Sequence, residues 1–289
     1  MHHQIINQLK KTKVMENIRT LLPALNLDQV RQSCPQAFAV EPSNEVSERY
    51  VFVNTENIIN DMLALGWHVV SAKQRKPRAG VKTRFTPHQI IFQNPEIQIV
   101  SEDEKLAPSI ILMNSHDGTH TLQFRMGIYR AACSNGLVIP EDEYTSFKIR
   151  HRGYTFDILK ESMDRSLSLV SEKTEVINTM IGRELTEQEQ MDLALKALLI
   201  RTNISTESVE TPITYSEETL KDVLKPRRPQ DRWNTLWHVF NRVQEAVTHG
   251  GFQVEVENGK RRTLPALKSF ERDFRMNEKL FSEALEFIN

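Results

Sequence analysis

Residues 68–92 read HVVSAKQRKPRAGVKTRFTPHQIIF, two runs of β character joined by a basic connection. Both runs contain adjacent β-branched residues, Val69-Val70 and Ile90-Ile91, as is typical of strands. Pro77, Gly80 and Pro87 interrupt regular structure between the runs. We therefore predict a long antiparallel hairpin with a basic tip. Its six cations, with no acid among them, are Lys73, Arg75, Lys76, Arg78, Lys82 and Arg84.

A helix precedes this hairpin and two more β runs follow it. ENIINDMLALG has an apolar face at helical spacing, with Thr55 as its expected N-cap and Gly66 as its end. Upstream of that helix, residues 50–53 alternate like a strand. Downstream, SIILMNSH and THTLQF are joined by Asp117-Gly118, a dipeptide typical of two-residue hairpin turns. Four runs after one helix predict an antiparallel sheet with one face packed and the other free.

The second half has the periodicity of helices. Apolar residues recur at helical spacing over residues 157–181, which predicts one long amphipathic helix. Thr186 and Glu189 have the spacing of a capping box that opens a second helix. A third helix, in DRWNTLWHVFNRVQEAVTHGG, is expected to begin at Asp231, to include Trp233 in its apolar stripe and to end at Gly250. FQVEVE and KRRT predict a short hairpin after it.

The predicted fold class is therefore α+β, an antiparallel sheet with a long basic hairpin in the first half and a helical second half packed on it. We expect a helical entry segment over residues 1–46, a β-rich region over 47–156 and a mainly helical region over 157–289. No long Gly/Ser/Pro linker divides the last two regions, so we expect them to form one unit.

The composition limits the kinds of function that we expect of this chain. There are 37 Lys and Arg against 38 Asp and Glu, a net charge of −1, so any attraction to a polyanion must be local. Cys34 and Cys133 form no CxxC pair, which favours a reducing cytoplasm and argues against structural zinc. No window approaches eighteen apolar residues, and neither GxxxxGK[ST] nor GxGxxG occurs, so we expect no membrane segment and no cofactor.

Two smaller basic clusters also fall on predicted loops or strand ends. They are Lys148, Arg150 and Arg152, and Lys260, Arg261 and Arg262. If folding brings these clusters and the hairpin together, they form a cationic track of the kind that grips phosphate backbones without reading sequence. If they scatter, the charges serve solubility and keep sheet edges from pairing. All twelve cations are our candidate nucleic-acid-binding residues, and no catalytic or metal residue is assigned.

Three further motifs allow both a chemical and a structural interpretation. Cys133 has His116 and His120 nearby in the sequence and could be a nucleophile, although small cysteines before turns are more often buried filler. The run SHDGTH has a His/Asp/His pattern but lacks a fourth ligand. Asn241 and Glu245, one helical turn apart, could orient a substrate or bridge a neighbouring helix end, which is the commoner use.

TLQFRMGIYRAACSNGLVI, followed later by NTLWHVFNRVQEAVTHGGF and FRMNEKLFSEALEFI, resembles the phage- and plasmid-encoded domain-of-unknown-function family 932. The resemblance runs from about Ser47 to the C-terminus. Its most specific parts are CSNGL and the helix with Trp237, Asn241 and Glu245. It implies a mobile-element setting and a cytoplasmic location, and no settled activity. The order of strands and helices is also similar to that of single-strand annealing proteins of the Rad52 and Redβ type, a topological likeness only.

The leading functional hypothesis is a non-enzymatic nucleic-acid-binding protein of a phage or plasmid, which binds or anneals single strands during replication or recombination. We expect it to act as a homo-oligomer, because weak backbone contacts gain strength by repetition along a strand. The alternative is a protein-interaction module that inhibits a host defence system, with a host protein as its partner. An enzyme built on Cys133, His116, His120 and Glu245 is a third hypothesis.

Overall fold

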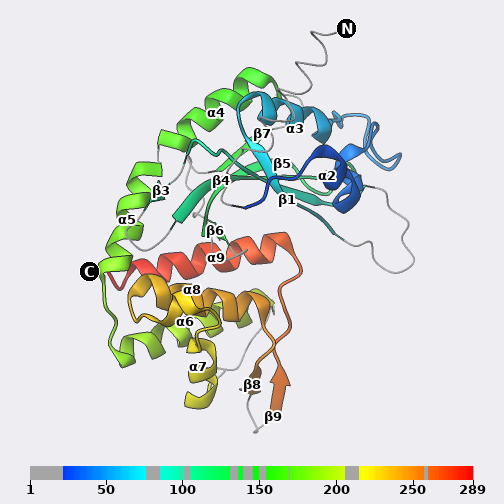
Figure 1. The fold of residues 1–289 in the computed structure, drawn as a ribbon. Coiled ribbons are helices and arrows are strands. Elements are labelled where there is room, and N and C mark those ends of the chain that lie inside the picture. The colour runs from blue at the N-terminus through cyan, green and yellow to red at the C-terminus, as the bar shows by residue number, and fades with distance from the viewer. Residues whose placement is uncertain are drawn as a thin grey trace. The chain divides into compact units, whose positions relative to one another are not determined.

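A computed structural model describes residues 22–75, 85–97, 99–100, 105–130, 136–138, 146–149, 154–168, 170–205, 215–256 and 260–288. The chain divides into two compact units that interleave in sequence. The first unit comprises Met1–Ala131 and Phe147–Asp164, and the second comprises Ala132–Ser146 and Arg165–Asn289. The first carries an antiparallel sheet and the second is mainly helical, so the α+β class is confirmed (Figure 1).

Four strands form the body of the sheet in the first unit, in the order β1-β2-β4-β5. They are β1 (His68–Gln74), β2 (His88–Gln93), β4 (Lys105–Asn114) and β5 (Leu122–Arg130), and each neighbouring pair is antiparallel. Among the short strands of this sheet, β3 (Ile99–Val100) pairs with β4, and β7 (Ser146–Ile149) pairs with β5. The predicted antiparallel pairing of β1 with β2 is confirmed.

Helices α2 (Leu27–Ser33), η1 (Pro35–Phe38) and α3 (Thr55–Ala64) precede β1. One face of the sheet packs against α3, and its side chains are the core of the unit. Registered neighbours on this face include Ile90, Leu112 and Phe124, each with no exposed surface. Helix α4 (Phe156–Ser168) begins in this unit, where the Tyr154 hydroxyl donates to Asp61 Oδ2 of α3 at 2.6 Å. The predicted helix end at Gly66, which has φ of 81°, is confirmed.

Three local predictions for the first unit are wrong. Residues 50–53 are not a strand, because side chains hold them: the Tyr50 hydroxyl donates to Ser115 O at 3.0 Å, and Asn114 Nδ2 donates to Val53 O. Asn54, not Thr55, is the N-cap of α3, and its side chain accepts from two backbone amides. The β4–β5 connection spans residues 115–121 rather than two residues.

Helix α8 (Leu236–His249) is central in the second unit and is buried from Leu236 to Thr248. It contacts helices α5 (Val170–Gly182), α6 (Glu187–Ser205), α7 (Glu217–Leu224) and α9 (Phe270–Leu285). Strands β8 (Gln253–Val256) and β9 (Lys260–Thr263) form the predicted hairpin after α8. Strand β6 (Gly136–Val138) also falls within this unit.

Two predictions about the start of α8 are wrong. Asp231 lies in a separate 3-10 helix, η3 (Pro229–Arg232), and Thr235 is the N-cap of α8. Trp233 is 67% exposed and does not belong to the apolar stripe. The predicted end at Gly250 is confirmed. Where one helix was predicted over 157–181, the structure has α4 and α5, and residue 169 between them lies outside the described residues.

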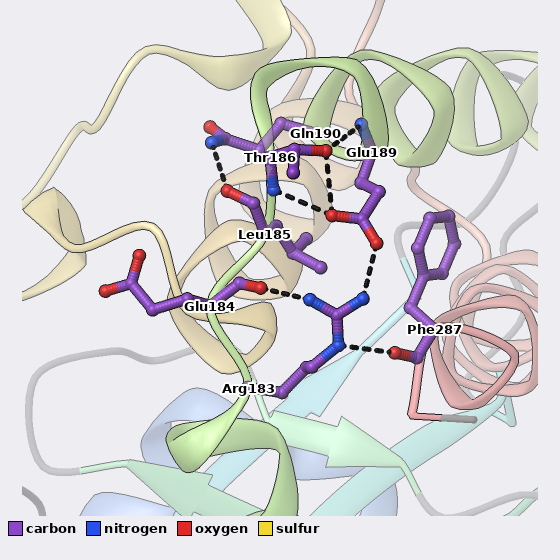
Figure 2. Close-up of polar contacts among 7 residues, drawn as sticks. All are labelled: Arg183, Glu184, Leu185, Thr186, Glu189, Gln190 and Phe287. Atoms are coloured by element: carbon purple, nitrogen blue, oxygen red, sulfur yellow. Dashed lines mark hydrogen bonds and ion pairs between the residues drawn. The ribbon is translucent and has the colours of Figure 1, made fainter.

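The capping box predicted at the start of α6 is confirmed, and further residues bond to it (Figure 2). The Thr186 amide donates to Glu189 Oε2 at 2.7 Å, and the Glu189 amide donates to Thr186 Oγ1 at 3.3 Å. Arg183 pairs with the other Glu189 oxygen, and its Nε donates to Phe287 O at 3.1 Å. These bonds, with the Arg183 charge, hold the pKa of Glu189 below its usual value. The N-terminus of α6 is thereby tied to the chain segment after α9.

Candidate nucleic-acid interface

The base of the basic hairpin is fixed by main-chain bonds. The Arg75 amide donates to Pro87 O at 2.8 Å, and the Thr86 hydroxyl donates to Arg75 O at 2.9 Å. On the other side of β1, the Cys34 thiol donates to Lys73 O at 3.6 Å. Because β1 is bonded from both sides, the backbone that carries Lys73 and Arg75 has little freedom.

The two cations at this base, Lys73 and Arg75, are exposed. Within the part of the chain that the structure describes, neither forms an ion pair, whereas other exposed cations do: Lys221 and Lys225 pair with Glu217 and Asp222 at 2.5 Å. An exposed cation without an acidic partner remains available to a phosphate. This pair of free cations is the core of the candidate interface.

A buried polar network supports the hairpin base from beneath. Thr55 Oγ1, at the start of α3, lies 2.9 Å from His88 Nε2, 3.3 Å from His116 Nε2 and 3.1 Å from Asn114 Nδ2. His88 Nδ1 faces Thr86 O at 3.4 Å. This arrangement assigns the hydrogen to His88 Nδ1, so that the Thr55 hydroxyl donates to Nε2 and accepts from the other two groups. The network links α3 to the residues that clamp Arg75.

The face of the sheet opposite α3 carries most of the polar side chains of these strands. We call it the outer face, and two of its registered rows run from β1 to β5. The rows are Lys73, Gln89, Met113 and Gln123, and Ser71, Ile91, Ile111 and Arg125. Lys73 is exposed and Gln123 and Arg125 are half-buried, while the side chains between them are buried. The accessible polar groups of this face therefore lie on its two outer strands.

One residue of the second basic cluster, Lys148, lies on a strand of the same sheet. Lys148 is on β7, which pairs with β5, while Lys73 is on β1. Four strand spacings separate β1 from β7, so the two backbones are about 19 Å apart. Arg150 and Arg152 lie outside the described residues, as does the side chain of Lys148. Of these two clusters, the structure therefore places only the backbones of Lys73 and Arg75, on one side of the sheet, and of Lys148, on the other.

The third cluster lies on β9, in the other unit. Arg262 is exposed, and Arg261 is exposed but pairs with Glu218 at 3.4 Å. Burial, together with the charges of Arg272 and Arg262, holds the pKa of Arg201 below its usual value. The Arg201 side chain donates to Val247 O and Pro265 O at the end of α8. Arg262 therefore belongs to a locally positive part of the second unit.

Several predicted residues lie outside the described residues. They are Lys76, Arg78, Lys82 and Arg84 of the hairpin tip, the side chain of Lys260, and Cys133. The base of the hairpin belongs to the first unit and β9 to the second.

Of the residues with alternative chemical interpretations, Asn241 and Glu245 have partners within the fold, while Cys133 lies outside the described residues. Burial raises the pKa of the Cys34 thiol to about 12, which disfavours the reactive thiolate. Glu245 accepts two bonds from Arg228, both at 3.1 Å, and Asn241 Nδ2 donates to Trp237 O at 2.7 Å. Among the described residues, no group of three or more His, Cys, Asp or Glu is placed to hold a metal ion. No described helix has the length and apolarity to cross a membrane.

Sequence reasoning missed the polar residues of the outer face. Gln89 and Gln123 join Lys73 in one row, and Arg125 lies in the next. The signal was present in LQFRMG, where Gln123 and Arg125 alternate with apolar residues, whereas HQIIFQ has Ile91 between its two glutamines on the same side. The register that aligns the two runs depends on the long β4–β5 connection, which the sequence does not specify.

Comparison with known proteins gives a family and two curated relatives. The family described as Domain of unknown function (DUF932) matches residues 43–279. UPF0380 protein YafZ of Escherichia coli (strain K12) is 29% identical over 263 residues, 90% of this chain and 91% of the relative. UPF0380 protein YfjQ of the same organism is 29% identical over 257 residues, 89% of each chain. No solved structure matches the chain significantly.

Proposed function

The chain belongs to the family Domain of unknown function (DUF932), and from this premise and its uncompensated cations we propose that it is a non-enzymatic, single-strand nucleic-acid-binding protein. It acts in replication or recombination of a phage or plasmid, as a homo-oligomer that repeats weak contacts along a strand. The proposed contacts are to phosphates, because the chain has no overall positive charge and its available cations are grouped.

The hairpin base carries this proposal. Lys73 and Arg75 stand exposed and without an acidic partner among the described residues, on a backbone bonded to Cys34 on one side and to Pro87 and β2 on the other. The sequence adds four cations before the chain returns to the sheet at Thr86. Like charges held close together repel, so a fixed cationic group is favourable where a polyanion binds and releases its counterions.

The salt dependence of binding tests the proposal. Affinity for a labelled single-stranded oligonucleotide is measured by fluorescence anisotropy over a series of salt concentrations. The logarithm of the association constant should fall linearly with the logarithm of salt, and Lys73→Gln with Arg75→Gln should lower the slope by about 1.4, or about 0.7 per lost phosphate contact.

Lys221→Gln with Lys225→Gln is the matched control, since it removes the same charge from ammonium groups already paired with carboxylates. It should leave the slope unchanged. The proposal fails if the protein ignores oligonucleotides at low salt, or if both double variants change the slope equally. A stoichiometric host protein that copurifies after nuclease treatment, with no nucleic-acid binding, would favour the interaction module instead.

A further inference from the structure

One large aromatic side chain of the second unit faces solvent. Trp233 lies between η3 and α8 and is 67% exposed, whereas Trp67 and Trp237 are 2% and 0% exposed. Exposing an indole forfeits the hydrophobic free energy that its burial would supply. Isolated exposed apolar residues are common, so exposure alone assigns no role. The way the surrounding backbone is held gives the second observation.

The backbone on both sides of Trp233 is fixed. Arg242 Nη2 donates to Trp233 O at 3.3 Å and to Asn234 Oδ1 at 3.1 Å. The Leu185 amide donates to Asn234 O at 2.9 Å, and the Leu236 amide donates to Arg183 O at 2.7 Å. Glu184 and Thr235 form an antiparallel bridge between these two bonds. The residues after Trp233 are therefore paired with the segment that precedes α6.

That partner segment is itself held in place (Figure 2). Arg183 is bonded to Glu189 and to Phe287 O, and Gln190 Nε2 donates to Leu185 O at 3.1 Å. Arg242 Nη2 donates to Gln190 Oε1 at 3.5 Å and also to Trp233 O, so one guanidinium group binds both segments. The exposed indole is thus attached to a backbone that hydrogen bonds already fix before any ligand binds.

The bonds that hold Trp233 are made by a buried charge. Arg242 is 6% exposed, and the partners described for its Nη2 are neutral oxygens. Burial lowers the pKa of its guanidinium, while the Asp231 charge acts in the opposite direction. Burying a guanidinium among neutral acceptors is costly. In this fold, the buried guanidinium fixes the position of residues 233 and 234 through its hydrogen bonds.

Exposed cations accompany the indole along the same segment. Arg227 and Arg232 are exposed, and neither forms an ion pair within the described part of the chain. Their neighbours differ, since Arg228 is bound to Glu245 and Lys225 to Asp222. Arg232 uses only its Nε, which donates to Pro229 O at 2.9 Å. A free guanidinium directly before an exposed indole provides a phosphate contact beside an aromatic surface.

We propose that Trp233 is a base-stacking platform for single-stranded nucleic acid and that Arg227 and Arg232 contact the adjacent phosphates, an inference that rests on the function proposed above. Single strands present unstacked bases, and an aromatic side chain binds any base through its π face. A fixed backbone reduces the conformational entropy that stacking would otherwise cost. This site lies in the second unit, and the hairpin base lies in the first.

The test compares two variants on two ligands, a normal single-stranded oligonucleotide and one whose bases are replaced by abasic residues. Trp233→Ala should weaken binding of the normal oligonucleotide about tenfold, which is about 1.4 kcal/mol. It should bind the abasic strand as the unaltered protein does, since both retain the phosphate contacts. Trp233→Phe should keep most of the affinity because it keeps a ring.

Intrinsic fluorescence gives an independent readout, because stacking should quench the one exposed tryptophan among the three in the sequence. Leu199→Ala, a truncation of another exposed apolar side chain in the same unit, is the control and should not alter affinity. If Trp233→Ala binds the normal strand as tightly as the unaltered protein, the stacking site is refuted and the proposed function stands. If the unaltered protein binds neither ligand at low salt, both are refuted.

Discussion

At the scale of single residues, the network around Thr55 shows how buried polar side chains can fix the base of an exposed hairpin. One hydroxyl serves two histidines and an amide, and every one of these groups is fully buried. Buried polar groups are favourable only when their hydrogen bonds are made, so the network specifies one arrangement of α3, β2 and β4. That arrangement includes the clamp on Arg75, and it requires a neutral His88.

The charge state of His88 makes stability depend on pH. Burial, followed by the proximity of His116, lowers the pKa of His88 from its usual value of 6.5 to about 3, against the opposing effects of Thr86 O and Asp117. Below pH 6.5 the unfolded chain therefore binds a proton that the folded chain does not. The free energy of unfolding should fall by about 1.4 kcal/mol per pH unit from this residue, or about 2 kcal/mol between pH 6.5 and 5.

Urea unfolding at several pH values between 5 and 7 measures this effect. His88→Gln should be less stable at pH 7. Its free energy of unfolding should also depend less steeply on pH, by an amount that corresponds to the uptake of up to one proton on unfolding. His120→Gln, at a half-buried position on the β4–β5 connection, is the comparison and should keep the slope of the unaltered protein. An unchanged slope in His88→Gln would show that this histidine is protonated in the folded state.

At the scale of elements, the end of α8 depends on one glycine. Gly250 has φ of 63° and ψ of −143°, a conformation available in practice only to glycine. It also has no room for a side chain, since a Cβ atom would lie 2.3 Å from Leu264 O and 2.8 Å from Pro265 C. The segment after β9 crosses the helix end here, where Arg201 binds Pro265 O. Gly250 therefore sets the path from α8 to the β8–β9 hairpin.

Substitution of the two adjacent glycines should separate strain from crowding. Gly250→Ala combines both effects and should destabilise the second unit by at least about 3 kcal/mol. Gly251→Ala should cost only about 1 kcal/mol, because its φ is 86° but no atom lies within 4 Å of the added Cβ. Thermal unfolding measures both. Equal losses would mean that the Leu264 carbonyl yields to the new methyl group at little cost.

Elements with strong local signals could be predicted from the sequence. The helix ends at Gly66 and Gly250 and the capping box at Thr186 depend on neighbours within a few residues, and the β1–β2 pairing joins strands that follow one another in the sequence. The failures depend on distant partners. Residues 50–53 alternate like a strand, but their bonds come from the end of β4 and the residue after it, and Asp231 resembles a cap but lies in η3. Nothing near these residues in the sequence indicates those partners.

At the scale of the whole molecule, the sequence shows where cations are and the structure shows which remain available. Arg228 and Arg261 look no different in sequence from Arg232 and Arg262, yet the first two are paired with acids. Pairing depends on the position of α7 and α8 relative to these residues, which local patterns do not encode. The candidate site could therefore be predicted at the hairpin base, whereas the segment before α8 was missed because Trp233 was assigned to the helix.

The two proposed binding surfaces, one on each unit, predict a dependence on oligonucleotide length. A strand of about four nucleotides is long enough for one surface, so a chain should bind two such strands. Lys73→Gln with Arg75→Gln should remove one of them, and Trp233→Ala should weaken the other. A strand long enough to engage both units should bind once per chain and more tightly, because its second contact is intramolecular. Titration calorimetry over a series of lengths measures both quantities. A stoichiometry of one at every length, with both variants weakening the shortest strand, would mean that the two surfaces form one site and that the units act together.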